Sequence, residues 1–310
     1  MKQIKTITLN PAFDLHYSME RFEEKMENYV QSVLCDAGGK GVNISRALTV
    51  GGTENTAYVI LGNENGAAFA AQLARDGLRF VPLYIEGRIR ENITLHPAND
   101  GETRISLDTF SVSVRELEAL EALLNVTEGD LIAFAGRLPR GIDRETAVGF
   151  LQRLVKAGAR LIVDSNSLAT EDLQAVHPWL IKPNEQEIAA FLGRRVDCPV
   201  DAVNAAAELV ARGVAEEVMI SLGGDGAVWS DGKRKLILSV PKLSHPVSTI
   251  GAGDSTLAGL LAATARGECI EKVLCCAVAY GTAACMIEGT LPPNPEDVAR
   301  VLKQIKVKEI

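Results

Sequence analysis

The clearest chemical signal in the chain is a glycine-rich loop at residues 249–256, followed by small and apolar residues up to position 263. These small residues are typical of a buried helix, whose first turn leaves backbone N–H groups unpaired and carries partial positive charge. Gly251, Ala252 and Gly253 would let an anion approach those N–H groups. Asp254, ionised in the first turn, could accept a proton from an attacking hydroxyl. The pattern predicts a phosphate cradle with a general base; an Asp N-cap after a flexible loop is the alternative.

A second stretch places glycines around a lysine, with Gly38 and Gly39 before Lys40 and Gly41 after it. Glycines permit close approach of a ligand to the backbone. Lys40 offers a positive charge, and Asn43 offers a donor and an acceptor. The stretch is a candidate ligand loop, or else a strand-to-helix turn with a solvated lysine.

Two shorter stretches carry carboxylates. Asn184 with Glu187 three residues later forms a helix capping pair, after Lys182. Capping leaves Glu187 able to order the water shell of Mg²⁺, which touches few protein groups directly. Asp14 follows the first predicted strand, where it could accept two sugar hydroxyls or belong to an Asx-type turn.

Ser221 to Gly226 follows a predicted strand and precedes another, so locally it is a hairpin turn. Nowhere does the sequence contain the Walker A string or the full dinucleotide fingerprint, because Thr256 occupies the place of the third glycine.

The elements around these stretches alternate between strands and helices. Short apolar runs that end at Gly, Asp or Ser are typical of strands buried on both faces of a parallel sheet. The predicted strands are 4–9, 57–61, 130–135, 160–164 and 217–222; the predicted helices are 66–76, 114–124, 143–157 and 202–212. This order predicts a doubly wound α/β fold with ligands beyond the carboxyl ends of the strands.

Two segments interrupt the alternation. Residues 28–36 and 90–108 carry short alternating patterns that indicate exposed antiparallel strands. We expect one domain over residues 1–310, with a small β-sheet lid from insertions at roughly 12–36 and 88–110.

Composition restricts the function. Lys and Arg number 32 against 40 Asp and Glu, so the net charge is −8 and a nucleic-acid or anionic membrane partner is disfavoured. The six cysteines form no C-x-x-C pair, and the four histidines show no metal-ligand spacing. The N-terminal residues lack the apolar core of a secretory signal, and residues 273–287 are too short to span a bilayer and suit a buried helix. We therefore expect a cytoplasmic protein.

Taken together, the stretches at 8–14, 38–43, 182–187 and 251–255 resemble those of the ribokinase-like sugar kinases, the PfkB family, in order and spacing. They look most like its phosphosugar branch, which contains 1-phosphofructokinases, tagatose-6-phosphate kinases and the minor 6-phosphofructokinases. The resemblance covers essentially the whole chain. It implies a three-layer α/β/α sandwich with a β-sheet lid, usually paired through the lids in a homodimer.

The resemblance also implies transfer of the γ-phosphoryl group of MgATP to a sugar hydroxyl, with Asp254 as catalytic base and the amides of residues 251–253 as anion hole. Residues that would contact ATP are Lys182, Asn184, Ser221, Gly223, Gly224, Asp225, Gly226 and Gly253. Asn184 and Glu187 would position Mg²⁺, mostly through water. Asp14, Gly38, Gly39, Lys40 and Asn43 would contact the sugar.

A phosphosugar needs a cation for the phosphate that it already carries. Lys40, Arg90 and Arg104 are the candidates, and Arg can bind phosphate with two parallel hydrogen bonds. The alternative for Arg90 and Arg104 is a solvated strand charge. The chain departs from its relatives at Arg137, at Glu91 and over residues 165–168, which leaves the sugar open.

These features predict an ATP-dependent kinase for a phosphorylated ketohexose, first of all fructose 1-phosphate. Tagatose 6-phosphate, fructose 6-phosphate or an unphosphorylated sugar remain open within the class. A non-catalytic sugar-phosphate sensor is the alternative from another class of protein. The presence of Asp254 argues against it, because a sensor needs no catalytic base and would be free to lose this residue. An NAD-dependent oxidoreductase is disfavoured by the missing fingerprint.

Overall fold

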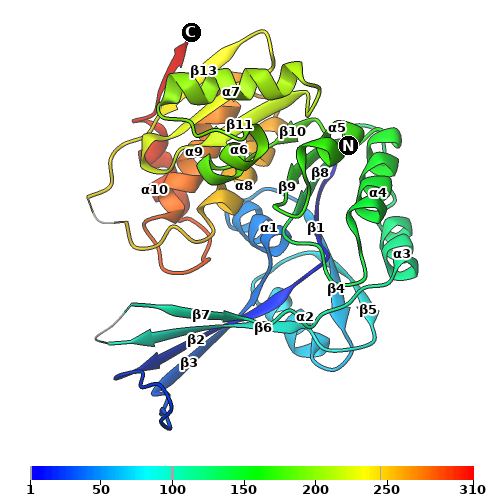
Figure 1. Cartoon of the computed structure of the whole chain (residues 1–310), viewed down its shortest axis with the longest axis vertical. Helices are drawn as coiled ribbons and strands as arrows, with labels where there is room; N and C mark the ends of the chain where they lie inside the picture. The colour runs from blue at the N-terminus through cyan, green and yellow to red at the C-terminus, as the bar shows by residue number, and fades with distance from the viewer. Residues whose placement is uncertain (1, 99–100, 245) are drawn as a thin grey trace.

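A computed structural model of the chain describes residues 2–98, 101–244 and 246–310, so residues 99 and 100 of the predicted lid range and His245 lie outside it. Two sheets are present. The large sheet has ten strands in the order β14-β13-β12-β11-β10-β9-β8-β1-β4-β5, and the small sheet has four in the order β3-β2-β6-β7 (Figure 1).

The large sheet is parallel from β11 to β5 and antiparallel at its other end. Its strands are β1 (Ile4–Thr8), β4 (Thr56–Gly62), β5 (Phe80–Ile85), β8 (Leu131–Ala135), β9 (Arg160–Asp164), β10 (Leu180–Ile181), β11 (Glu217–Ser221), β12 (Ala227–Ser230), β13 (Lys235–Ser239) and β14 (Lys306–Glu309). Every residue of β8 is buried, as its continuous apolar run predicts for a strand covered on both faces. Every residue of β1 is buried as well, although its sequence alternates apolar and polar residues.

Helices cover both faces of this sheet and make the fold a three-layer α/β/α sandwich. One face packs mainly on α2 (Gly66–Arg75), α3 (Val114–Leu124), α4 (Arg144–Lys156), α5 (Thr170–Val176), α6 (Glu185–Leu192) and α7 (Pro199–Ala211). The other packs mainly on α1 (Lys40–Val50), α8 (Ala252–Ala265), α9 (Ile270–Ala284) and α10 (Pro295–Leu302). The predicted fold class is therefore confirmed.

Small residues let α8 and α9 pack closely in the second layer. A Cβ on Gly259 would lie 2.5 Å from the carbonyl oxygen of Cys276, so only glycine fits where the helices cross. The predicted buried helix at 273–287 is α9, which begins and ends three residues earlier. No helix of the described residues is long and apolar enough to cross a membrane.

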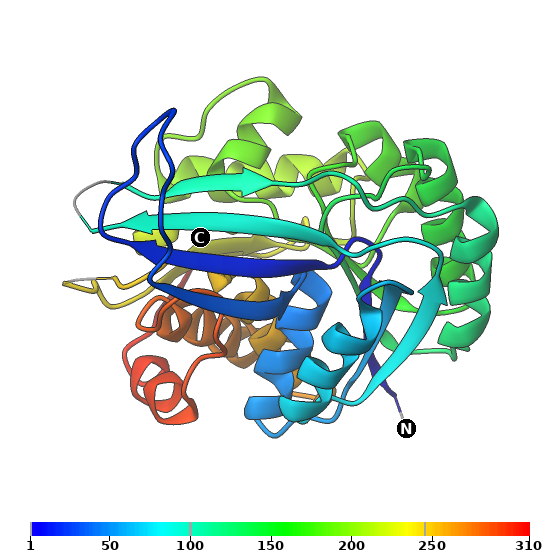
Figure 2. The ribbon, with the colours of Figure 1, turned by 90° about the horizontal axis from the view of Figure 1, so that it is seen from below.

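The small sheet stands off one end of the sandwich, below it in Figure 1 and across the front in Figure 2. Its strands are β2 (Ala12–Met19), β3 (Ser32–Gly38), β6 (Arg90–Pro97) and β7 (Thr103–Ser106). The strand predicted at 28–36 begins only at Ser32, because residues 28–31 belong to the exposed loop after β2. That prediction was wrong at its first four residues: the β2–β3 ladder ends at Ser32, and only Gln31 continues it, with one hydrogen bond from its N–H to the Ser18 carbonyl at 2.8 Å.

Candidate active site

A pocket of about 840 Å³ opens where the strands of the large sheet end, between the sandwich and the small sheet. It is lined from the ends of β1, β8, β9, β10 and β11, from the start of α8 and from β2, β6 and β7. This is the edge at which parallel sheets gather ligands. The volume lies in the upper part of the range of roughly 300–1,000 Å³ that ligand pockets span.

The glycine-rich loop forms the start of α8. Gly251 is the N-cap with φ of 77°, a conformation that glycine adopts without strain. No side chain caps this end, and the Ala252 N–H makes only a long hydrogen bond, 3.4 Å, to the Thr249 carbonyl, so the first turn can still offer N–H groups to a ligand. Gly251, Ala252 and Gly253 all line the pocket. The helix end is therefore built as an anion cradle.

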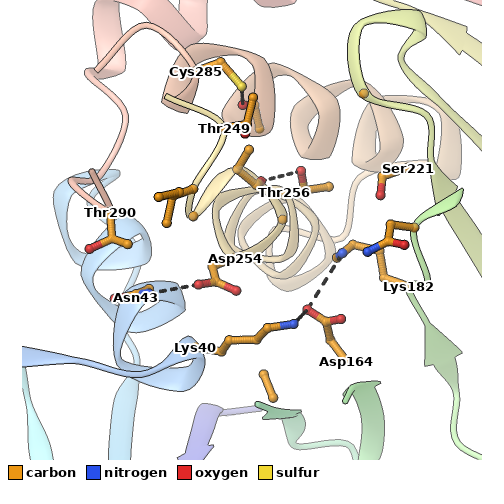
Figure 3. A pocket seen from close by; sticks show the side chains of 18 of the residues that line it. Lys40, Asn43, Asp164, Lys182, Ser221, Thr249, Asp254, Thr256, Cys285 and Thr290 are labelled. Carbon is orange, nitrogen blue, oxygen red and sulfur yellow. Dashed lines mark hydrogen bonds and ion pairs between the residues drawn. The ribbon is translucent and has the colours of Figure 1, made fainter. Parts of the chain in front are cut away.

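Asp254 lies in the first turn of α8 and is 6% exposed. Burial raises the pKa of its carboxyl to about 6, against the opposing effects of Lys40 and of a hydrogen bond from Asn43. The Asn43 Nδ2 donates to Asp254 Oδ2 at 2.9 Å, as the dashed line in Figure 3 marks. The carboxyl is mostly ionised at pH 7 and more basic than a solvated aspartate, as a general base requires.

Lys40 and Lys182 approach the same buried carboxylate, Asp164, at the end of β9 (Figure 3). Lys40 Nζ donates to Asp164 Oδ2 at 3.2 Å, and Lys182 Nζ lies 3.7 Å from the same oxygen. Burial acts to raise the pKa of Asp164, but Lys182 and Lys40 outweigh it and the pKa is lowered. Two lysines share the Asp164 carboxylate here, and the Asp254 carboxylate also faces them, so both lysine charges are held beside the cradle.

Asn184 and Glu187 make the predicted capping pair at the start of α6. Asn184 Oδ1 accepts from the backbone N–H of Gln186 and of Glu187, each at 2.9 Å, and Glu187 Oε2 accepts from the N–H of Asn184 at 2.9 Å. Glu187 still lines the pocket, and a carboxylate has lone pairs beyond the one that capping uses. Mg²⁺ keeps several waters, so this donor set fits a magnesium ion held through water.

The turn between β11 and β12 fits a nucleotide in part. The two strands are antiparallel and a single helical turn, Gly223–Asp225, joins them, as the predicted hairpin requires. Ser221, Gly223, Gly224 and Gly226 line the pocket. Asp225 does not; it is exposed and pairs with Lys242 at 2.6 Å.

The small sheet presents Asp14 and Arg90 to the pocket. Arg90 donates from Nε to Asn10 Oδ1 and from Nη1 to Asn92 Oδ1, both at 2.8 Å, and Asn92 Nδ2 donates to Asp14 Oδ1 at 2.8 Å. Arg104 Nη2 lies 3.6 Å from the same Asp14 oxygen. The polar side chains of β2, β6 and β7 thus form one network on the pocket side.

Of the residues singled out from the sequence, most line this pocket, and Gly38 joins Asp225 as an exception. Gly38 lies beneath the Asp14 carboxylate, and a Cβ there would collide with Asp14 Oδ2. Glycine at position 38 therefore leaves room for the Asp14 carboxylate, and does not itself contact the pocket.

Several pocket residues were missed by the sequence reasoning. Asp164 was taken only as the end of a strand, although a buried Asp there is itself a signal of a charged site. Asn10 lies in the stretch at 8–14 but was given no role of its own, and Asn92 carries no recognisable spacing. Thr8 Oγ1 is buried without a hydrogen-bond partner among the described residues and lines the pocket.

An anion cradle beside a basic carboxylate, with lysines around it and a sheet across its mouth, defines an enzyme that transfers a phosphoryl group to a hydroxyl. Comparison with known proteins gives the family. The model described as pfkB family carbohydrate kinase matches residues 7–297, nearly the whole chain. The chain belongs to the PfkB family and is an ATP-dependent carbohydrate kinase.

Curated relatives cover the full length. A protein named 1-phosphofructokinase from Borreliella burgdorferi is 32% identical over 99% of both chains, and one from Vibrio cholerae is 30% identical over 100% of this chain and 98% of its own. Among solved structures, phosphofructokinase-2 from Escherichia coli in complex with potassium has a TM-score of 0.90 at 27% identity, over 98% of this chain and 99% of its own.

Proposed function

We propose that this enzyme transfers the γ-phosphoryl group of MgATP to the free terminal hydroxyl of fructose 1-phosphate, giving the 1,6-bisphosphate. Curated relatives that share 30–32% of their residues with it over the full length are named for that activity. A phosphosugar acceptor also accords with the charges at the small-sheet side of the pocket.

The observation that carries the proposal is an excess of arginine at this side of the pocket. Arg90, Arg104 and Arg137 line it together, against the single carboxylate of Asp14. Arg90 is half-buried and has neutral partners, Asn10 and Asn92, with no ion pair among the residues that the structure describes. A half-buried guanidinium that makes no ion pair suits a bound phosphate, which accepts two hydrogen bonds from it.

Arg137 thereby gains a role. It stands where relatives carry a smaller residue, and the sequence alone gave it none. Burial lowers the pKa of Arg90 and Asp14 opposes that effect; Arg137 adds a smaller lowering effect, through repulsion between the two guanidinium groups. A phosphate between them would relieve that repulsion.

In the proposed reaction the Asp254 carboxylate accepts the proton of the sugar hydroxyl while the hydroxyl oxygen forms its bond to the γ-phosphorus. The bond from that phosphorus to the β–γ bridging oxygen breaks, and ADP leaves. The amides of residues 251–253 would stabilise the charge on the transferred group, as preorganised N–H donors do. Lys40 and Lys182 add positive charge, and positioning accounts for the rest.

MgATP supplies the phosphoryl group and the charge neutralisation of its phosphates. We assign its triphosphate to Lys182, Asn184 and Gly253, its remaining contacts to the turn at Ser221–Gly226, and the water shell of Mg²⁺ to Glu187. Asp14, Gly39 and Asn43 would hold the sugar. The small sheet would act as a lid on a single kinase domain and exclude water, which competes as phosphoryl acceptor.

The experiment is a coupled ADP-release assay with MgATP and a panel of acceptors: fructose 1-phosphate, fructose 6-phosphate, tagatose 6-phosphate, fructose and ribose. The expected result is a kcat/KM for fructose 1-phosphate at least tenfold above that for any other acceptor. Preference for another phosphosugar would move the enzyme within its branch. Turnover of free fructose or ribose alone would contradict the phosphate-binding role of the arginines. The absence of turnover with every acceptor would favour a non-catalytic sugar-phosphate sensor.

We further propose a homodimer through the small sheets, in the cytoplasm. Exposed apolar side chains on that sheet support the dimer. All six cysteines are free, which agrees with a reducing compartment.

A further inference from the structure

Asn43 contacts the carboxyl group of Asp254, and a second contact decides which way its amide is turned. Arg46 follows Asn43 by three residues on α1, so both side chains lie on one face of the helix. Arg46 Nη1 donates to Asn43 Oδ1 at 3.3 Å. Because arginine has no acceptor, the Asn43 oxygen must face Arg46 and its NH₂ group must face Asp254.

Arg46 is itself held from two further elements. Its Nε donates to Asp76 Oδ2 at 2.9 Å, and its Nη2 donates to the Ala37 carbonyl at 2.8 Å. Asp76 is the C-cap of α2, and Ala37 belongs to β3 of the small sheet. Arg46 and Asn43 are each only 8% exposed. A buried charge-assisted network of this kind fixes its members in one arrangement.

The orientation matters because the two faces of the amide act oppositely on a carboxylate. An NH₂ group facing Asp254 stabilises the charged form and lowers its pKa, whereas a carbonyl oxygen there would repel it. The same hydrogen bond occupies Oδ2, and no hydrogen bond to Oδ1 occurs within the described part of the chain. The hydrogen bond lowers the basicity of Oδ2, which leaves Oδ1 as the more basic of the two oxygens.

We propose that Arg46, with Asp76 behind it, is a positioning residue that acts through Asn43 to orient the Asp254 carboxyl and to keep Oδ1 as its proton-accepting oxygen. The inference rests on the proposed role of Asp254 as base. Nothing in the pattern of the sequence distinguishes Arg46 from an ordinary helix residue. It also gives Asn43 a second task besides its expected contact with the sugar.

The test compares Arg46→Met, which keeps the volume of the side chain but removes every donor, with wild type over pH 5–9. Asp254 is also faced by Lys40 from α1, Asp164 from β9 and Lys182 from the loop before α6, all of which the variant retains. We expect kcat to fall about 10- to 100-fold, the scale of a small misplacement. The acid limb of kcat should move to higher pH by about half a unit or more, since the donor that lowers the pKa of Asp254 is no longer fixed.

Arg160→Met is the matched control. Arg160 is a half-buried arginine that stacks on Trp179 at 3.7 Å and begins β9, at the end of that strand opposite Asp164. The Arg160→Met variant should have a lower melting temperature than wild type, and the acid limb of its kcat profile should not move. If Arg46→Met does not fold, Asp76→Ala removes the acceptor that anchors Arg46 Nε, at a partly exposed position, and should shift the limb in the same direction, by less.

An acid limb and kcat unchanged in folded Arg46→Met would overturn the proposal, as would a rise in the KM for the phosphosugar alone. Two reference results keep this failure separate from that of the proposed function. Wild type without turnover of any acceptor would refute the kinase assignment, and an active Asp254→Asn would refute the base.

Discussion

Asp254 combines two properties that a buried carboxylate rarely combines, ionisation at neutral pH and enough basicity to take a proton. Its pKa of about 6 means that the carboxylate form is lost as the pH falls through that value. We therefore expect wild-type kcat to be level above pH 7 and to fall about tenfold per pH unit well below 6. Asp254→Asn should lower kcat by about 10²–10⁴-fold and abolish this dependence. A pH profile of single-turnover rates measures both, and an unchanged acid limb in a still active variant would contradict the assignment.

The same residue should trade stability for activity. Its pKa is raised in the folded protein, from 3.8 to about 6, so the native state binds the proton more tightly than the unfolded chain does. Ionisation of Asp254 therefore destabilises the folded protein. The loss of stability is complete above pH 6, and the stability returns as the pH falls towards 4. The pKa shift of about two units corresponds to at most ~3 kcal/mol of folding free energy. Replacement of Asp254 recovers this energy minus the contribution of the hydrogen bond from Asn43 that the variant loses. Asp254→Asn should raise the melting temperature at pH 8 and have no such effect at pH 4.

Substitution of Arg90 should affect the KM for the phosphosugar and not the KM for MgATP. Arg90→Gln should raise the KM for the phosphosugar by about 10–100-fold, because a charged hydrogen bond to phosphate is worth about 1.5–3 kcal/mol. The KM for MgATP should change little. Arg88→Gln is the matched control, two residues earlier, exposed and bound to Glu91 at 2.8 Å. Equal loss of affinity for both substrates in Arg90→Gln would assign it to the structure of the small sheet instead.

At the scale of the element, the start of α8 offers a substitution that should improve the fold and damage the site. Gly253 has ordinary helical geometry, and alanine would gain roughly 0.5–1 kcal/mol there through helix propensity. Its Cβ would lie 3.2 Å from Lys182 Nζ, inside the cradle. We expect Gly253→Ala to melt at a higher temperature and to lose about 100-fold in kcat/KM for MgATP.

Gly149→Ala in α4 is the control for that prediction. Its Cβ would make an ordinary contact, 3.5 Å from Arg153 Nη1, far from the pocket. Calorimetry should show a similar gain in stability and the assay should show unchanged kinetics. Loss of activity in both variants would mean that helix stiffness, not access to the cradle, is responsible.

The elements were largely predictable because strands buried on both faces leave continuous apolar runs, as β9 does at the residues expected. Elements with weaker patterns were not found: β10 has two residues, and β14 is exposed along its whole length. The cradle and the capping pair were predictable, since each is a local motif. Asp164, Asn92 and Arg46 were not, because their partners lie 124, 78 and 30 residues away in sequence and only the fold brings them together.

At the scale of the whole molecule, the small sheet has two faces of different character. The register of the ladders puts Asp14, Asn92 and Arg104 on the pocket side. Side chains alternate along a strand, so Leu15, Val33, Ile93 and Ile105 lie on the other side. Val33 is 59% exposed and Ile105 47% exposed. Two such faces packed together would cover both apolar surfaces and hold each sheet over its own pocket.

Val33→Asp tests this pairing. A charge at this exposed position of the apolar face, on the edge strand β3, should convert a dimer to a monomer in sedimentation velocity at micromolar concentration, because a buried unpaired carboxylate costs several kcal/mol. The KM for the phosphosugar should rise, since the sheet that carries Asp14 and Arg90 loses its support, while the melting temperature changes little at so exposed a site. Val200→Asp, an equally exposed valine on α7, should leave both the mass and the KM unchanged. A wild-type monomer would refute the pairing outright. A Val33→Asp dimer of wild-type mass would place the interface on another surface, and an unaltered KM in a monomeric variant would show that each sheet closes on its own pocket unaided.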